Sequence, residues 1–297
     1  MMNFGTVLTA MVTPFDPQGA VDYGKTEILV NHLIHHGTDA LVVAGTTGES
    51  PTLSKEEKLE LLRFVVKIVN KRIPVIAGTG SNNTHESIEL TRKAEIIGAD
   101  GIMLVAPYYN KPSQEGLYQH FKTIAEATNL PVMLYNIPGR TGVNVEPETI
   151  IKLSYIDNIV SVKEASGNLE AMTAIIRETD DHFFLYTGDD ALTLPTIAIG
   201  GTGVVSVASH VIGRELQEMI AAFQTGNVQR AQELHQYVLP IMQTMFIAPN
   251  PVPVKEALRL QGINTGSVRL PLVPLNKEQQ QIVSQQMDML QQQSQIG

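Results

Sequence analysis

The sequence predicts a closed barrel of eight parallel strands and eight helices, a (β/α)8 or TIM barrel, followed by a C-terminal helical extension. Short β-branched segments alternate with amphipathic segments about eight times along residues 1–224, and eight strand-helix units are the number that closes a parallel barrel. Hydrophobic residues make up 43% of the chain and charged residues only 17%, which indicates a large buried core. A doubly wound open sheet is the competing architecture, but no nucleotide fingerprint follows the first strand.

Each strand is expected where a short, mainly β-branched apolar run lies between turn residues. The expected strands are residues 7–12, 40–44, 74–77, 102–106, 131–135, 159–163, 183–186 and 203–207. Between them, apolar residues recur at helical spacing. The expected helices are residues 25–35, 54–69, 84–97, 113–127, 147–153, 169–177, 191–199 and 214–223. Ser54 and Glu57 form a capping-box pattern, and Ser113, Thr84 and Asp190 are candidate N-caps.

After Gln224 the pattern changes to helices alone. They are expected at residues 228–246, 254–260 and 277–293, with a stiff proline-rich joint at residues 249–253. In the last of these helices, apolar residues at helical spacing make the many glutamines a solvated face. We therefore divide the chain into a catalytic barrel, residues 1–224, and a helical appendage, residues 225–297.

Composition excludes several classes of function. The net charge of -9 and the lack of a polybasic run disfavour nucleic-acid and membrane partners. The chain has no cysteine, which removes disulfides, thiolate metal sites and cysteine nucleophiles. No apolar run approaches the ~18 residues of a membrane span, and no basic residue precedes Lys25, as a signal peptide requires. We expect a soluble cytoplasmic protein.

The sixth expected strand ends in a lysine. Alternation along residues 159–163 predicts Ile159, Ser161 and Lys163 on one face and Val160 and Val162 on the other. Burial of the Lys163 ammonium would lower its pKa and supply a free amine, which can form a Schiff base with a carbonyl group. The alternative is a strand-end lysine that extends into water, and only neighbouring functional groups can decide between the two.

Hydroxyl groups follow neighbouring strands at the same end of the predicted barrel, where barrel enzymes carry their chemistry. Tyr135 ends the fifth strand, and adjacent strands lie ~4.8 Å apart, so its phenol can exchange protons with an adduct on Lys163. A phenol needs help to act at neutral pH. Thr46, after the second strand, and Tyr109, after the fourth, are candidates for a hydroxyl chain.

Groups that suit carboxylates lie in the same set of loops. The hydroxyls and backbone N–H groups of Thr46 and Thr47, near a helix start, suit a small carboxylate. Arg140, in the loop after the fifth strand, can bind a second carboxylate in bidentate fashion. No cofactor and no metal is expected: His32, His35 and His36 have helical spacing but belong to the first outer helix, away from these loops.

Four segments, residues 45–49, 107–112, 135–142 and 162–167, resemble in order those of the dihydrodipicolinate synthase family. This family, also called 4-hydroxy-tetrahydrodipicolinate synthase, lies within the pyruvate-dependent class I aldolase superfamily. The resemblance covers essentially the whole chain. It implies a lyase that condenses pyruvate with L-aspartate 4-semialdehyde in diaminopimelate and lysine biosynthesis.

The resemblance also implies roles for individual residues. Lys163 would form the Schiff base, with Tyr135, Thr46 and Tyr109 as the proton relay. Tyr109 would come from the neighbouring subunit of a tight dimer, and two such dimers would form a homotetramer. The expected substrate-binding residues are Thr47 for the pyruvate carboxylate, Gly188 and the Val205 backbone for the pocket wall, and Arg140 for the carboxylate of the semialdehyde.

One departure from the family concerns regulation. Lysine-inhibited relatives have histidines where this chain has Lys55 and often Lys58, although Asn82, Glu86 and Tyr108 are kept. A cation at Lys55 would repel the ammonium of a bound lysine. We therefore expect weak or absent feedback inhibition.

Two other functions compete with the synthase reading. Another pyruvate aldolase of the superfamily would act on N-acetylneuraminate or a 2-keto-3-deoxy sugar acid; Tyr109 and Arg140 favour the synthase. A barrel that binds a ketoacid without turnover is the third reading, but a mere binder needs neither a reactive lysine nor the neighbouring phenol.

Overall fold

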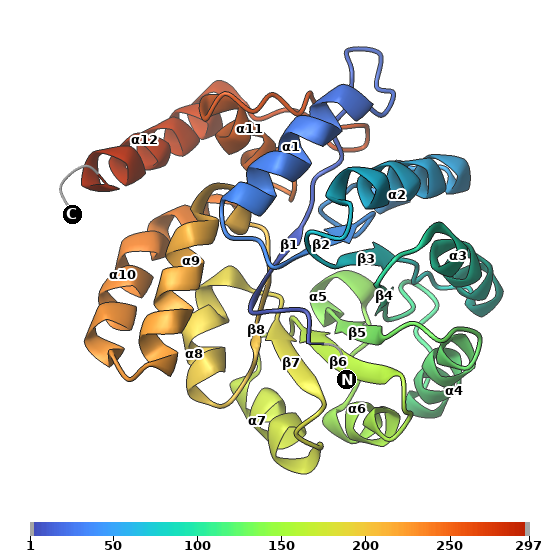
Figure 1. Cartoon of the computed structure of the whole chain (residues 1–297). Coiled ribbons are helices and arrows are strands. Elements are labelled where there is room, and N and C mark those ends of the chain that lie inside the picture. Colours follow the sequence, from blue (N-terminus) through green and yellow to red (C-terminus); the bar gives the residue numbers. More distant parts are fainter. Residues whose placement is uncertain (1–2, 295–297) are drawn as a thin grey trace.

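In a computed structural model, which describes residues 3–294, eight parallel strands close into a barrel in the order β1 to β8 (Figure 1). The predicted fold class is confirmed. The strands are β1 Val7–Ala10, β2 Ala40–Val43, β3 Val75–Gly78, β4 Gly101–Val105, β5 Val132–Asn136, β6 Ile159–Glu164, β7 Phe184–Thr187 and β8 Gly203–Ser206. Met1 and Met2, at the start of the segment considered for a signal peptide, lie outside the described residues.

Helices surround the strands (Figure 1). They are α1 Tyr23–His35, α2 Lys55–Val69, α3 Thr84–Ile97, α4 Gln114–Ala125, α6 Pro147–Ser154, α7 Leu169–Glu178, α8 Thr193–Ala198 and α9 Ser209–Gln224. Two short helical segments in the loops that follow strands were not predicted, because each is about one turn long: η1 Ser50–Thr52 and α5 Pro138–Thr141. The helix predicted at residues 191–199 is divided into a 3-10 turn, η2 Asp190–Leu192, and α8. Among residues 3–294, no helix is long and apolar enough to cross a membrane.

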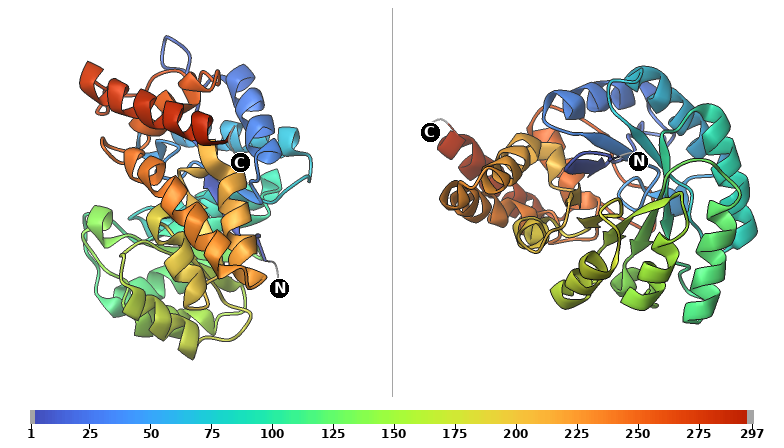
Figure 2. Two further views of the ribbon diagram at one scale, coloured as in Figure 1. Left: turned by 90° about the vertical axis from the view of Figure 1, so that its left-hand side faces the viewer. Right: turned by 60° about the horizontal axis from the view of Figure 1, so that its bottom comes forward.

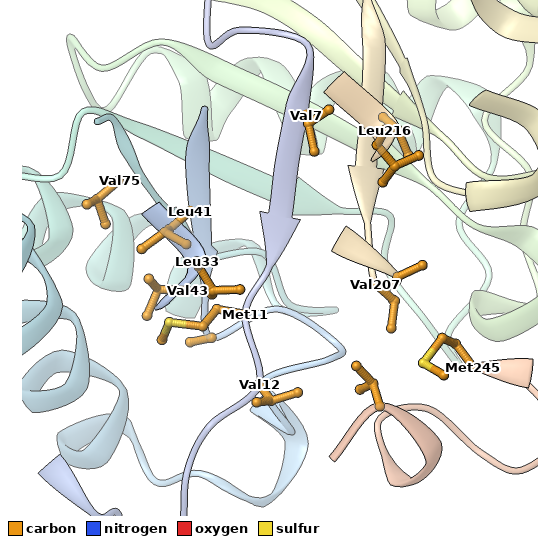
Figure 3. Close-up of a cluster of buried hydrophobic side chains, with 14 of the residues drawn as sticks. Val7, Met11, Val12, Leu33, Leu41, Val43, Val75, Val207, Leu216 and Met245 are labelled. Atoms are coloured by element: carbon orange, nitrogen blue, oxygen red, sulfur yellow. The ribbon is translucent and has the colours of Figure 1, made fainter. Parts of the chain in front are cut away.

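Two groups of buried apolar side chains hold the barrel together. The inner group lies within the ring of strands and includes Leu8, Met103 and Val205. The outer group lies between the strands and the helices and includes Leu33 of α1 and Leu41 of β2 (Figure 3). Alternate residues of a strand pack in the inner and the outer group, so each strand is buried on both faces. This explains the nearly continuous apolar sequence of the strands.

The predicted starts of α2 and α4 are confirmed. Ser54 Oγ accepts a hydrogen bond from the Glu57 N–H at 3.1 Å, and a Glu57 side-chain oxygen accepts one from the Ser54 N–H at 2.9 Å, which completes the capping box. Ser113 caps α4 by accepting from the Gly116 N–H at 3.2 Å. These caps fix where the two helices begin after the loops of β2 and β4.

Two other predicted caps are wrong. Asn83, one residue before Thr84, caps α3, while the Thr84 hydroxyl is 2.9 Å from His120 Nδ1 on α4. Similarly, Asp189 caps η2, and Asp190 is fully buried. In each case the preceding residue has the extended backbone that an N-cap requires, and the predicted residue already lies within the helical segment.

The predicted faces of β6 are wrong at its start. The pairing of β5 with β6 shifts register between Val132 and Met133, where there is a bulge or irregularity. As a result Val160 packs in the inner group, whereas Ile159 and Val162 pack in the outer one. Lys163 still faces inward, against the ring of Tyr135, because the register is regular again beyond the bulge.

The C-terminal extension lies on one side of the barrel (Figure 2) and consists of α10 Val228–Thr244, α11 Val252–Leu260 and α12 Lys277–Ser294. The outer core continues into it through Met245 (Figure 3). Helix α9 begins at Ser209, earlier than the predicted residue 214. A bend at Ile212, where the backbone is not helical, separates this additional first turn from the predicted helix. Helix α11 begins at Val252, since Pro253 fits the first turn of a helix. The boundary at residue 224 remains a prediction.

Candidate active site

The predicted lysine and tyrosine are neighbours on adjacent strands. Tyr135 of β5 pairs in register with Lys163 of β6, and Lys163 Nζ lies 4.2 Å from the centroid of the tyrosine ring. The side chains are 5% and 3% exposed. The alternative reading, a lysine that extends into water, is therefore wrong. The ring face holds the ammonium in place at the carboxyl end of the barrel.

Gly188, directly after β7, makes room for the lysine. A Cβ atom on Gly188 would lie 2.8 Å from Lys163 Cε and 2.7 Å from Ala165 Cβ, closer than packed carbons allow. Gly188 is therefore needed for the packing of Lys163, while its place in the wall of a substrate pocket stays a prediction. Val205 of β8 is also buried and lies in the inner group, paired with Leu8 of β1.

An amide and a carboxyl group join the ends of β5 and β6. Asn136 Nδ2 donates to Glu164 Oε2 at 2.9 Å, and Glu164 Oε1 accepts from the Ser166 N–H at 2.7 Å. Burial raises the pKa of the Glu164 carboxyl. Because Asn136 follows Tyr135 and Glu164 follows Lys163, this bond fixes the backbones that carry both side chains.

Asp190 plays a similar part between the ends of β7 and β8. Its carboxylate accepts from the Ser206 hydroxyl and from the N–H groups of Val207 at 3.1 Å and Ala208 at 2.9 Å. Complete burial raises the pKa of the carboxyl group. The bonds hold the loop after Gly188 against the end of β8.

A cavity of about 780 Å³ opens at this end of the barrel. Thr46, Tyr135 and Arg140 all line it. Arg140 is on α5, the short helix that follows β5, and is exposed. The structure therefore brings a hydroxyl, a phenol and a guanidinium to one opening next to Lys163, and that opening is large enough for two small carboxylates.

Thr47, next to Thr46, does not line this cavity and is 2% exposed. Its Oγ1 accepts a hydrogen bond from Asn250 Nδ2 at 3.0 Å. The neighbouring Glu49 has a left-handed backbone, with φ of 55°, at the start of η1. The C-terminal extension thus holds the Thr47 side chain through Asn250.

Tyr109 is the one predicted relay residue that stands apart from the others. Its side chain is 90% exposed, and its backbone is left-handed, with φ of 75°. Its N–H donates to Thr141 O at 3.2 Å, which fixes the loop after β4 against α5. Within residues 3–294, no hydrogen bond joins the hydroxyls of Thr46, Tyr109 and Tyr135 to one another. A single chain therefore leaves the predicted relay incomplete.

The histidines of α1 make structural contacts. The rings of His32 and His36 stack with centroids 4.1 Å apart, and His32 Nε2 is 3.1 Å from His210 O. In the part of the chain that the structure describes, no group of three His, Cys, Asp or Glu side chains could hold a metal ion.

Sequence reasoning missed several residues that support the site. Asn136, Glu164 and Asp190 are polar residues at strand ends whose side chains are buried, and their position next to Tyr135, Lys163 and Gly188 was the available signal. Asn250 lies between two prolines in a segment that was read only as a joint. A polar side chain in an otherwise apolar linker is a sign of a long-range contact.

Comparisons with known proteins agree with this geometry. A model of the dihydrodipicolinate synthetase family matches residues 3–290. The chain is 62% identical over 280 residues to a 4-hydroxy-tetrahydrodipicolinate synthase of Oceanobacillus iheyensis, which covers 94% of this chain and 95% of the relative.

Solved structures are equally similar. A dihydrodipicolinate synthase from Bacillus anthracis is 60% identical, with a TM-score of 0.96 over 97% of this chain and 99% of the other. A synthase from Cyanidioschyzon merolae, solved with lysine bound, is 51% identical, with a TM-score of 0.95 over 97% and 98% of the two chains. The similarity thus extends over both the barrel and the extension.

Proposed function

The chain belongs to the dihydrodipicolinate synthetase family, and from this premise we propose that Lys163 forms the Schiff base through which it carries out the family's reaction. The chain is a lyase that condenses pyruvate with L-aspartate 4-semialdehyde to give 4-hydroxy-tetrahydrodipicolinate, in diaminopimelate and lysine biosynthesis. The main support for this role of Lys163 is its burial against the ring of Tyr135.

The chemistry begins when the Lys163 amine adds to the keto carbon of pyruvate and water leaves, which forms an imine. Loss of a methyl proton converts the imine into an enamine, and the enamine carbon attacks the aldehyde carbon of the second substrate. The amino group of that substrate then displaces Nζ from the imine carbon. This step closes the ring and releases Lys163.

Tyr135 is placed to move protons in these steps. Its ring lies against the Lys163 ammonium, so its hydroxyl can reach groups on the carbon that Nζ attacks. Thr46, in the same cavity, is the next member of the proposed relay. The third member is Tyr109, and its 90% exposure supports the proposal that it enters the site of a neighbouring subunit.

The proposed binding groups divide between the two substrates. Thr47 holds the pyruvate carboxylate, and Gly188 with the Val205 backbone forms the wall behind Lys163. Arg140, at the exposed mouth of the cavity, binds the carboxylate of the semialdehyde. We further propose a cytoplasmic homotetramer built from two tight dimers.

Feedback inhibition by lysine is proposed to be weak. Lys55 and Lys58 line the same cavity as Glu86 and Tyr108, and Lys55 forms an ion pair with Glu89. Burial lowers the pKa of Lys58. Glu89 is already paired with Lys55, and Lys58 adds a second amine to the same surface. This surface therefore offers little electrostatic attraction to the ammonium of a bound lysine. Strong inhibition by submillimolar lysine in a synthase assay would refute this proposal.

A substrate assay tests the proposed function. The protein is incubated with pyruvate and either L-aspartate 4-semialdehyde, N-acetylmannosamine or a simple sugar aldehyde, and loss of pyruvate is followed. We expect rapid loss with the semialdehyde alone. Faster turnover with a sugar aldehyde would indicate the competing aldolase activity, and no turnover with any aldehyde would indicate a ketoacid-binding protein.

A further inference from the structure

The loop of residues 45–49 is bound to the C-terminal extension by three contacts. Asn250 Nδ2 donates to Thr47 Oγ1 at 3.0 Å, across 203 residues of sequence. Lys255 Nζ of α11 lies 2.9 Å from Glu49 Oε1. The Arg269 N–H donates to Glu49 Oε2 at 2.9 Å. The extension therefore reaches beneath the end of the barrel that carries Lys163.

The bond from Asn250 determines what the Thr47 hydroxyl can do. An Asn amide nitrogen only donates, so Thr47 Oγ1 is the acceptor and its own proton remains available for another acceptor. The opposite orientation of the amide would leave its N–H₂ group buried without that partner, which is rarer and costlier than an unpaired carbonyl oxygen. Asn250 thus orients Thr47 as a donor, as a carboxylate requires.

The ion pair of Glu49 with Lys255 keeps this loop in place. The side chains of Glu49 and Lys255 are 1% and 4% exposed. Their contact at Glu49 Oε1 is an ion pair whose angles do not meet those of a hydrogen bond. Lys255 Nζ also donates to Ser267 O at 2.8 Å and lies 4.4 Å from the centroid of the Phe15 ring. Loss of either charge would leave the other buried without its ionic partner, so the pair ties the Glu49 side chain, at the end of this loop, to α11.

We propose that Asn250 is a positioning residue for the substrate carboxylate, which acts through the Thr47 hydroxyl and is held in register by the Lys255–Glu49 pair. The extension would then set the affinity of the barrel for its ketoacid substrate. The inference rests on the proposed function, in which Thr47 binds the carboxylate of pyruvate. Asn250 itself makes no contact with the substrate in this account.

A double-mutant cycle tests the inference. The variants Asn250→Ala and Thr47→Val, and the two combined, are assayed with varied pyruvate at saturating semialdehyde. We expect each single variant to raise the KM for pyruvate about 10-fold or more, since a hydrogen bond to a charged group is lost. The double variant should be no worse than Thr47→Val alone, because Asn250 acts only through that hydroxyl.

Two further variants keep the test independent of folding. Asn250→Asp preserves shape but can only accept from Thr47, so it draws the hydroxyl proton away from the substrate and should also raise the KM for pyruvate. Asn264→Ala is the matched control: among the described residues, the side chain of this exposed asparagine of the extension bonds only the Gly266 N–H in its own loop. It should leave the KM for pyruvate unchanged.

The outcomes separate this inference from the proposed function. Reduction with borohydride at saturating pyruvate should label Lys163 in every variant. If the unmodified protein is not labelled at Lys163, the proposed function is wrong and this inference falls with it. If it is labelled, but Asn250→Ala lowers only the melting temperature, or the two single effects add, then Asn250 merely anchors the linker and the inference alone is overturned.

Discussion

Lys163 is confined by a glycine and an aromatic ring. Tyr135 lies against its Nζ, and a side chain at Gly188 would collide with its stem. A Schiff base must present its carbon to a second substrate at a defined angle, and a displacement of about 1 Å can cost on the order of 100-fold in rate. The proposed Schiff base at Lys163 therefore requires a residue without a side chain directly after β7.

The substitution Gly188→Ala tests this confinement. The new Cβ would meet Lys163 Cε at 2.8 Å and Ala165 Cβ at 2.7 Å, so the lysine must move. We expect kcat to fall at least about 10-fold while the far-ultraviolet circular dichroism spectrum stays the same. Gly24→Ala in α1, where the nearest atom is 3.5 Å from the new Cβ, is the control and should keep full activity.

Tyr135→Phe isolates the role of the phenol. The ring that covers Lys163 is kept, and only the hydroxyl is lost. Removal of a proton-transfer group should lower kcat by about 100-fold or more, with a much smaller change in the KM for pyruvate. Tyr155→Phe, at a tyrosine that is 76% exposed, provides the control. An unchanged kcat for Tyr135→Phe would remove the phenol from the relay.

Among single residues, those at the ends of strands could be predicted from the sequence, whereas those placed by contacts between distant parts of the chain could not. Lys163 and Tyr135 were found because both end apolar runs on adjacent strands. The faces of Ile159 and Val160 were misjudged because a register shift leaves no local signal. The bond of Asn250 to Thr47 spans 203 residues, and no local pattern announces it.

Among the elements, α3 and α4 are joined by a buried histidine. His120 of α4 contacts Thr84 of α3 through Nδ1 at 2.9 Å, and its Nε2 is buried without a partner within the described residues. Burial lowers the pKa of His120 to about 4, from an ordinary value of 6.5. The folded protein thus keeps this ring neutral where the unfolded chain would protonate it.

This difference predicts a pH dependence of stability. Because the folded pKa lies below the unfolded one, the contribution of His120 is fully present above pH 6.5 and is lost as the pH falls toward about 4. Its loss is about 1.4 kcal/mol per pH unit within that window. In urea unfolding between pH 4 and 6.5, His120→Asn, which can keep the bond to Thr84, should show a slope shallower by about one proton.

An unchanged slope in His120→Asn would mean that His120 binds the same number of protons in the folded and unfolded states.

The positions of most helices and strands could be predicted from local sequence patterns. All eight strands were predicted, and the starts of α2 and α4 were fixed by Ser54 and Ser113. The segments η1 and α5 were missed, since a single turn has no helical repeat to detect.

At the scale of the whole molecule, one chain does not bring all three members of the proposed relay together. Thr46 and Tyr135 line one opening, Lys163 lies against the Tyr135 ring, and the side chain of Tyr109 is exposed on a left-handed backbone. A residue held at positive φ with its ring exposed is placed for contact with something outside the chain. The proposed dimer supplies that contact through an isologous interface, in which each Tyr109 enters the partner's site.

Complementation between inactive variants tests this exchange. Lys163→Ala and Tyr109→Phe are each purified, mixed under mild dissociating conditions and reassociated. A hybrid dimer contains one site with both groups intact, so random exchange should restore activity at about a quarter of the sites. If Tyr109 acted within its own chain, each site of a hybrid would lack one group and the mixture would gain no activity.

Reductive trapping of the ketoacid shows whether Lys163 is the residue that forms the Schiff base. The protein is incubated with pyruvate and sodium borohydride, digested, and mapped by mass spectrometry, with Lys163→Arg treated in parallel. The account predicts a stable adduct on the peptide that contains Lys163, on no other lysine, and none in the variant. An adduct on a different lysine, or inactivation without any adduct, would contradict it.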